Sequence, residues 1–137
     1  MQLSTQETLL HMAVGKCNLN MVQLLMDYGA NINAKGTDPH ECTPLLKAVN
    51  LNNTNIVEIL LQNGANLKYS DGHTVVHRAI RWEDSRMIPI LLANCDLKKI
   101  KDKYGRTPLE YSMDLRKIKI TKQILYNEFW NELNNIF

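Results

Sequence analysis

Cysteine is scarce in this sequence, with three residues in 137. Cys17, Cys42 and Cys95 are odd in number and far apart, so a disulfide framework is not expected and a reducing compartment is favoured. No apolar run approaches the length of a membrane-spanning helix, about 20 residues. The first residues lack the basic stretch and uninterrupted apolar core of a signal peptide. These absences favour an intracellular protein, in the cytoplasm, the nucleus or both.

A strong net charge is lacking as well. The formal charge of +2 at pH 7 is too small to indicate a nucleic-acid partner. Residues 1–68 carry four lysines and five acidic residues, whereas residues 69–137 carry twelve basic and nine acidic residues. A mildly basic second half could steer an acidic partner, although salt screens such an effect.

Catalytic motifs are absent too, because no glycine-rich phosphate loop and no pair of carboxylates framed by apolar residues is found. His73 and His77 are four residues apart, as in some metal sites, but no Glu or Cys nearby completes a ligand set. Cys42 beside His40 could act as a nucleophile with a base, but no third group orients them. We expect no enzymatic activity, no metal and no cofactor, and keep a metal or enzymatic site at these residues as a remote alternative.

The sequence does contain a repeated pattern, which is clearest in residues 43–67. Thr43 can cap a helix through its hydroxyl, and Pro44 suits the first helical position. Residues 56–61 give a second helix an apolar stripe, and Gly64 ends it. The pattern predicts a helix–turn–helix hairpin that is too short to bury its own apolar face.

Similar segments begin at Thr8, Thr74 and Thr107, so that the four threonines are 35, 31 and 33 residues apart. A Thr-Pro-Leu-His-x-Ala opening with a period near 33 is typical of ankyrin repeats. The chain resembles ankyrin-repeat proteins over roughly residues 4–125. The resemblance implies an all-α solenoid of about four helix-turn-helix repeats with β-hairpin-like fingers, in a single domain of residues 1–137. The repeats are expected at approximately 4–36, 37–70, 71–101 and 102–137.

The turns between paired helices depart from the family pattern. Asn52 replaces the usual glycine in the second repeat, and Asn tolerates the left-handed region. Cys17, Glu83 and Arg116 stand at the same place in the other repeats. Those three turns are expected to be strained or to close differently.

The third repeat departs further. Pro89 falls inside its predicted second helix. If that helix begins near Ser85, Pro89 lies just beyond the first turn and can kink it. No glycine ends this helix, and Asn94 is the expected left-handed cap.

The last repeat should continue into a long helix over residues 117–135. Its apolar positions suggest one continuous stripe: Ile120, Ile124, Phe129, Leu133 and Ile136. We interpret it as a C-terminal capping helix, since a terminal repeat must hide its outer face. The alternative is an exposed patch for a partner, formed by Phe129, Trp130, Ile136 and Phe137.

In ankyrin proteins, partners usually dock on the concave face, which finger tips and exposed first-helix positions form. Transferred by register, this face comprises His40, Leu51, Asp71, His73, Arg81, Trp82, Lys103, Tyr104, Arg106 and Leu115. Leu51, Trp82 and Leu115 share one register and should form an apolar row. Trp, Tyr and Arg are enriched among binding hot spots. The alternative for Trp82 is packing against a neighbouring repeat.

The resemblance thus implies a protein-binding module that acts as an inhibitor or an adaptor. One hypothesis is an IκB-like inhibitor of a Rel/NF-κB-type factor, acting in a host cell if the source is a virus. Another is an adaptor or substrate receptor that docks a partner through the C-terminal helix. We expect no nucleic-acid or membrane partner, and a monomer or a weak homodimer.

Overall fold

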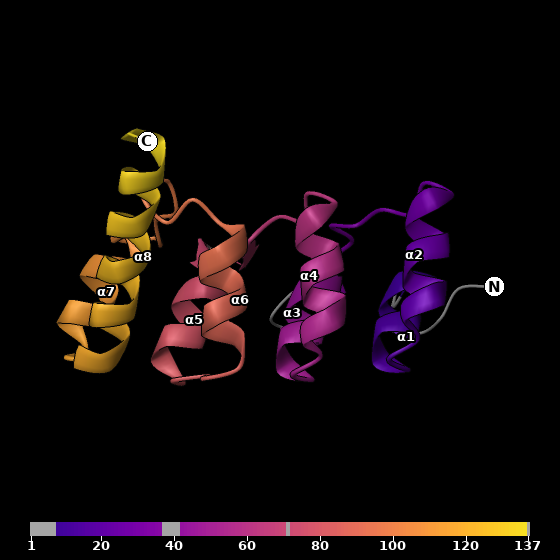
Figure 1. Ribbon diagram of the computed structural model, residues 1–137. Coiled ribbons are helices and arrows are strands. Elements are labelled where there is room, and N and C mark those ends of the chain that lie inside the picture. The colour runs from indigo at the N-terminus through magenta and orange to yellow at the C-terminus, as the bar shows by residue number, and fades with distance from the viewer. Residues whose placement is uncertain (1–7, 37–41, 71, 137) are drawn as a thin grey trace. The chain divides into compact units, whose positions relative to one another are not determined.

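The computed structural model describes residues 8–36, 42–70 and 72–136, which form eight helices and two short strands (Figure 1). This content confirms the all-α architecture expected from the repeats. The chain divides into two compact units, Met1–Asp71 and Gly72–Phe137. The expected extension of the first finger falls on residues 37–41, which lie outside the described residues.

The first unit consists of two helix pairs. Its elements are α1 (Leu9–Gly15), α2 (Leu19–Asp27), α3 (Pro44–Asn50), α4 (Thr54–Gln62) and β1 (Lys68–Ser70). Thr8 and Thr43 cap α1 and α3, because each hydroxyl accepts a hydrogen bond from the backbone N–H three residues on. The pairs stack, with α1 against α3 and α2 against α4. Stacking buries the apolar faces that no pair can hide alone, including Leu10, Val22, Leu45 and Leu60.

The second unit repeats this plan. Its elements are β2 (His73–Thr74), α5 (Val75–Arg81), α6 (Met87–Asn94), α7 (Pro108–Asp114) and α8 (Ile118–Ile136). Thr74 and Thr107 cap α5 and α7. Within the unit α5 packs against α7 and α6 against α8. The buried side chains between them include Ile80, Met87, Leu91 and Ile124.

All four turns within the helix pairs close in the same way. Cys17, Asn52, Glu83 and Arg116 have φ values of 54°, 55°, 52° and 57°. In each turn the next residue donates its N–H to the carbonyl five positions back, at 2.9–3.1 Å. Of the two outcomes expected for the other three turns, strain or a different closure, the different closure does not occur. The expected strain is present, because a residue with a Cβ pays roughly 1 kcal/mol to enter the left-handed region.

Helix α6 begins later than its counterparts. Asp84 stands where asparagines cap α2 and α4, and its carboxylate accepts from the N–H groups of Arg86 and Met87 at 3.3 and 3.2 Å. Pro89 is the third helical residue, where no intrahelical N–H bond is required. The helix thus begins two residues after Ser85, and Pro89 lies within its first turn, so the condition for a kink is not met.

The end of α6 also differs from the expectation. Asn94 is the last residue of the helix and is not left-handed. Its amide Nδ2 donates to the carbonyl of Ile90 at 2.8 Å, and Cys95 follows with an extended backbone. The helix stops because the chain straightens after a side-chain bond satisfies one of its last carbonyls.

Helix α8 is a single helix of 19 residues, which confirms the long closing helix. Ile120 and Ile124 are buried, whereas Phe129 is 60% exposed and Ile136 is exposed too. The expected single stripe is therefore wrong. At 3.6 residues per turn, residue 129 faces away from residue 120. Phe137, the last residue of the alternative patch, lies outside the described residues.

Candidate protein-binding surface

Helices α5 and α7 each end in an exposed apolar side chain. Trp82 is the C-cap residue of α5 and is 68% exposed, and Leu115 is the exposed C-cap of α7. Leu51 occupies the same position after α3 in the first unit and is also exposed. The common register is thus the C-cap of the first helix of each pair. Trp82 is largely open to solvent, so the alternative that its side chain is buried against a neighbouring repeat does not hold.

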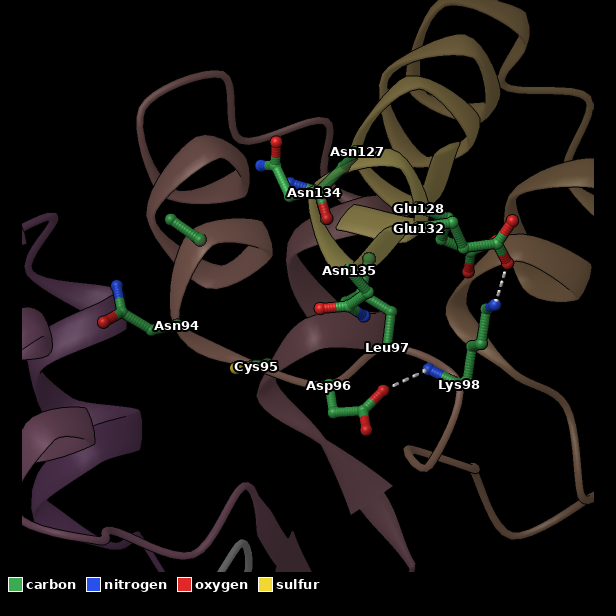
Figure 2. A pocket seen from close by; sticks show the side chains of 11 residues that line it. Asn94, Cys95, Asp96, Leu97, Lys98, Asn127, Glu128, Glu132, Asn134 and Asn135 are labelled. Carbon is green, nitrogen blue, oxygen red and sulfur yellow. Dashed lines mark hydrogen bonds and ion pairs between the residues drawn. The ribbon is translucent and has the colours of Figure 1, made fainter. Parts of the chain in front are cut away.

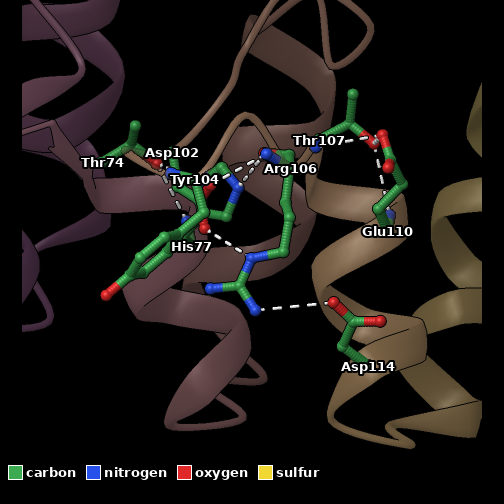
Figure 3. Close-up of polar contacts among 8 residues, drawn as sticks. All are labelled: Thr74, His77, Asp102, Tyr104, Arg106, Thr107, Glu110 and Asp114. Carbon is green, nitrogen blue, oxygen red and sulfur yellow. Dashed lines mark hydrogen bonds and ion pairs between the residues drawn. The ribbon is translucent and has the colours of Figure 1, made fainter.

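The finger before α7 is organised by Asp102. Its Oδ1 accepts from the N–H groups of Tyr104 and Arg106 at 3.0 and 2.8 Å, and its Oδ2 accepts from Arg106 Nε at 2.9 Å (Figure 3). Gly105 donates its N–H to the carbonyl of Asp102 at 3.0 Å. The Asp102 side chain is only 8% exposed. One carboxylate therefore holds both the backbone of the finger and the side chain of Arg106.

The charge of Asp102 is part of this arrangement. Burial acts to raise the pKa of Asp102, but the hydrogen bonds from Arg106 and Tyr104 outweigh it, so the pKa lies below its ordinary value. The carboxylate stays ionised at neutral pH and keeps its four acceptor sites for these donors.

Arg106 lies between two aromatic rings. Its guanidinium carbon is 5.2 Å from the centre of the Tyr104 ring and 4.7 Å from that of Tyr111. Nη1 also donates to Asp114 Oδ2 at 3.5 Å (Figure 3). Lys103 places Nζ 5.0 Å from the Tyr104 ring. These two cations hold the Tyr104 ring in place, although its side chain is 70% exposed.

His77 ties this finger to α5. Its Nε2 lies 2.8 Å from the carbonyl oxygen of Arg106, and its Nδ1 lies 2.6 Å from Thr74 Oγ1. A carbonyl oxygen only accepts, so Nε2 carries the proton and Nδ1 accepts from the threonine hydroxyl. Burial lowers the pKa of His77, and this outweighs the opposing hydrogen bond to Arg106. The neutral ring thus links the helix start to the next finger.

A close approach at Gly72 brings the backbone just before β2 near that of Lys103. Gly72 has φ +82°, and a Cβ placed on it would lie 2.9 Å from the Cβ of Lys103 and 3.1 Å from its Cα. Any larger residue would push the two backbones apart. His73 follows directly and is exposed.

The first unit contains the same histidine tie. His11 Nε2 lies 2.7 Å from the carbonyl oxygen of Cys42, and Thr8 Oγ1 lies 2.8 Å from His11 Nδ1. A family model described as ankyrin repeats (3 copies) matches residues 1–71 of the chain, which is just over half its length. The chain belongs to the ankyrin-repeat family. No curated protein matches it.

The ankyrin family model covers the first unit, but the second unit is built with the same local structure. Thr74 repeats the cap of Thr8, and His77 repeats the tie of His11. Glu83 repeats the left-handed turn of Cys17.

The structure brings most of the predicted binding residues to the surface of the units. Those that are exposed are Leu51, His73, Arg81, Trp82, Lys103, Tyr104 and Leu115. Arg106 is half-buried and serves inside the finger. His40 and Asp71 lie outside the described residues. The use of any of these ten residues by a partner stays a prediction.

Sequence reasoning missed two residues that support this surface, Asp102 and Tyr111. A signal for Asp102 exists, since Asp followed three residues later by Gly105 is a common turn pattern. Tyr111 has no such signal, because its contacts with Arg106 and His77 depend on how α5 and α7 pack.

The residues singled out for chemistry are placed differently. His73 lies on β2 and His77 on α5, so they do not share a helix face. The described ranges hold no group of three His, Cys, Asp or Glu that could bind a metal ion. Cys42 Sγ donates to the carbonyl of Thr43 at 3.5 Å, and the suggested base His40 lies outside the described residues. Burial raises the pKa of Cys95 to about 11, so that its thiol stays protonated at neutral pH.

In the parts of the chain that the structure describes, no helix combines the length and apolar character needed to cross a membrane.

Proposed function

We propose that this ankyrin-repeat protein binds a partner protein through the aromatic surface of its second unit, defined as Trp82, Tyr104 and Leu115. The supporting observation is that two large aromatic side chains, each about two-thirds exposed, stand on well-supported positions. Trp and Tyr bury much area with few rotatable bonds, and residues held in place before binding lose little entropy. The ankyrin family is a family of protein-interaction modules, and this surface is where we place the interaction.

The surroundings of the aromatic surface favour a partner with acidic groups. Arg81 precedes Trp82, and Lys103 precedes Tyr104. Both cationic side chains are exposed. Positive charge at the rim of an interface speeds association with an acidic partner and adds specificity. We therefore expect binding to weaken with added salt.

Affinity capture from the native cell type tests this proposal. The double variant Trp82→Ala/Tyr104→Ala should lose a specific partner that the wild type retains, while the circular dichroism of both proteins agrees. Tyr28→Ala is the matched control, because Tyr28 is 83% exposed in the first unit and outside the proposed surface. Retention of every partner by the double variant would refute the proposal.

The biological role that we propose is inhibition, in which the aromatic surface covers a site that the partner needs. This role requires one surface only, whereas an adaptor requires two independent ones. An IκB-like inhibitor of a Rel/NF-κB-type factor is the specific form of this hypothesis. A pull-down with purified Rel-homology domains tests it, and absence of binding at micromolar concentration would remove it without affecting the broader proposal.

A further inference from the structure

Helix α8 presents an apolar face away from its own unit. Ile120 and Ile124 are buried on one side of the helix. On the opposite side lies a set of exposed residues that we call the α8 stripe: Ile118, Lys122, Leu125, Phe129, Glu132 and Ile136, of which Glu132 stands at the border with the inner face. Tyr126 and Trp130 stack beside it, with ring centres 6.3 Å apart and planes 7° apart. Four of the six stripe residues are large and apolar.

The inner face of the second half of α8 is polar instead. A cleft of about 520 Å³ separates it from the segment after α6, and the α8 residues that line this cleft are Asn127, Glu128, Glu132, Asn134 and Asn135 (Figure 2). An exposed ion pair between Lys98 and Glu132 crosses the cleft at its edge, at 2.5 Å. Exposed pairs contribute little to stability, so Glu132 can exchange Lys98 for a lysine of another helix at small cost. A helix that only covered its own unit would turn its apolar side inward. The second half of α8 does the reverse, so its apolar side is available for another surface.

The spacing of the α8 stripe is that of a coiled coil. Its six residues follow one another at intervals of four, three, four, three and four. This is the alternation of a and d positions in a heptad, which forms a seam along one side of a helix. A second helix with a matching seam is the partner that such a stripe fits.

The stripe matches itself when two copies run antiparallel. Centred on residue 127, the pairing sets Ile118 against Ile136, Leu125 against Phe129, and Lys122 against Glu132. Every apolar residue then meets an apolar residue, and both charged residues meet opposite charges. A parallel pairing in register would set Lys122 against Lys122 and Glu132 against Glu132, which like-charge repulsion disfavours.

We propose that two copies of this chain associate through antiparallel pairing of their α8 stripes. Nineteen residues make a seam of about 28 Å, and a coiled coil of fewer than three heptads associates weakly. Each α8 supplies both partners of a charge pair, so the dimer contains the Lys122–Glu132 contact twice. The dimer would carry two aromatic surfaces, and a partner that is itself dimeric would gain avidity. The pairing does not depend on the proposed function.

Sedimentation velocity of the full chain over a wide concentration range tests the pairing. The wild type should shift from monomer to dimer in the micromolar to millimolar range. Lys122→Glu should raise the dissociation constant about tenfold, because it replaces two attractive pairs by two repulsive ones. Glu132→Lys should do the same. The double variant Lys122→Glu/Glu132→Lys should restore the wild-type value, because the pairs are re-formed with signs exchanged.

The controls separate the pairing from folding and from net charge. Lys101→Glu makes the same charge change at an exposed loop residue before α7 and should leave dimerisation unchanged. Leu125→Glu should give a monomer with wild-type circular dichroism, since Leu125 is exposed and not part of the core.

Three results would overturn the proposal. One is a wild type that stays monomeric to about 1 mM. Another is a dimer that survives Leu125→Glu, which would place the interface elsewhere. The last is a double charge exchange that fails to restore the association lost in the single variants, which would exclude the antiparallel register.

Discussion

The two units share their construction and differ in what they expose. In each, threonines cap the first helices, left-handed residues close the turns, and one histidine ties a helix start to the next finger. The first unit exposes one large aromatic side chain among its described residues, Tyr28. The second exposes Trp82, Tyr104, Tyr126, Phe129 and Trp130.

This difference separates residues that specify the fold from residues that are left for binding. The caps, turns and ties occupy equivalent positions in both units, where the backbone needs them. The exposed aromatic residues make no comparable contribution to the core of their unit. The second unit is also the more basic one: residues 72–137 carry twelve basic and eight acidic residues, a net charge of +4, whereas residues 1–71 carry four and six, a net charge of −2. We therefore infer that the partner binds to the exposed surface of the second unit.

The largest expected changes in unfolding free energy come from substitutions in the cores of the two units. Leu60→Ala and Ile124→Ala each remove a fully buried side chain, and each should lower the free energy of unfolding by about 2–5 kcal/mol. Phe129→Ala should change it by less than about 0.5 kcal/mol, because Phe129 is exposed. Urea denaturation of dilute protein measures all three. A large loss for Phe129→Ala would show that the outer side of α8 belongs to the fold.

The hydrogen bonds of His11 and His77 should contribute similarly to the stability of the two units. His11→Ala and His77→Ala each leave a carbonyl and a threonine hydroxyl without their partner. Each should cost about 1–3 kcal/mol of unfolding free energy. Denaturation with the two variants in parallel tests the equivalence. If only one of the two variants is destabilised, the same hydrogen-bond geometry does not contribute equally to the stability of the two units.

The pH dependence of stability tests the environment of His77. Burial lowers the pKa of His77 in the folded protein below 6.5, so the unfolded chain binds the proton first as pH falls. The contribution of His77 is therefore complete above about pH 6.5 and is lost as pH drops through that value towards the folded pKa. His77→Gln should flatten the stability profile between pH 7.5 and 5.5. An unchanged slope in this variant would contradict the assignment.

The smallest expected effect concerns the left-handed turns. Cys17→Gly in the first unit and Arg116→Gly in the second should each stabilise the protein by about 0.5 kcal/mol, because the relief of backbone strain exceeds the added freedom of the unfolded chain. Asn52→Gly should be closer to neutral, since Asn tolerates this conformation. Thermal unfolding of the three variants provides the test, and destabilisation by Arg116→Gly would show that its side chain contributes more than strain costs.

The sequence was sufficient to predict the features that local chemistry decides. Thr8, Thr43, Thr74 and Thr107 marked the helix starts, because a hydroxyl cap acts within three residues. The length of α8 was also predictable from its lack of glycine. Periodicity is less reliable within α8, because it predicts one stripe for Ile120 and Phe129, although a separation of nine residues places them on opposite sides of the helix.

Predictions from the sequence failed where contacts between distant residues, or a choice between two local hydrogen bonds, decide the structure. Asn94 ends α6 through a side-chain bond to Ile90, although the left-handed cap was equally compatible with its chemistry. The support of Arg106 by Tyr111 depends on the packing of α5 against α7, which the pattern of a single repeat does not contain. Register did locate the exposed C-cap residues, because every repeat has the same turn.

The central claim is that the partner is bound by the aromatic surface of the second unit. The most direct measurement is the dissociation constant of the captured partner for Trp82→Ala and for Leu51→Ala, which occupy the same C-cap register in the two units. We predict that Trp82→Ala raises the constant at least about tenfold, as expected for a hot spot, and that Leu51→Ala has a smaller effect. An equal or larger effect of Leu51→Ala, or no effect of Trp82→Ala, would contradict the account.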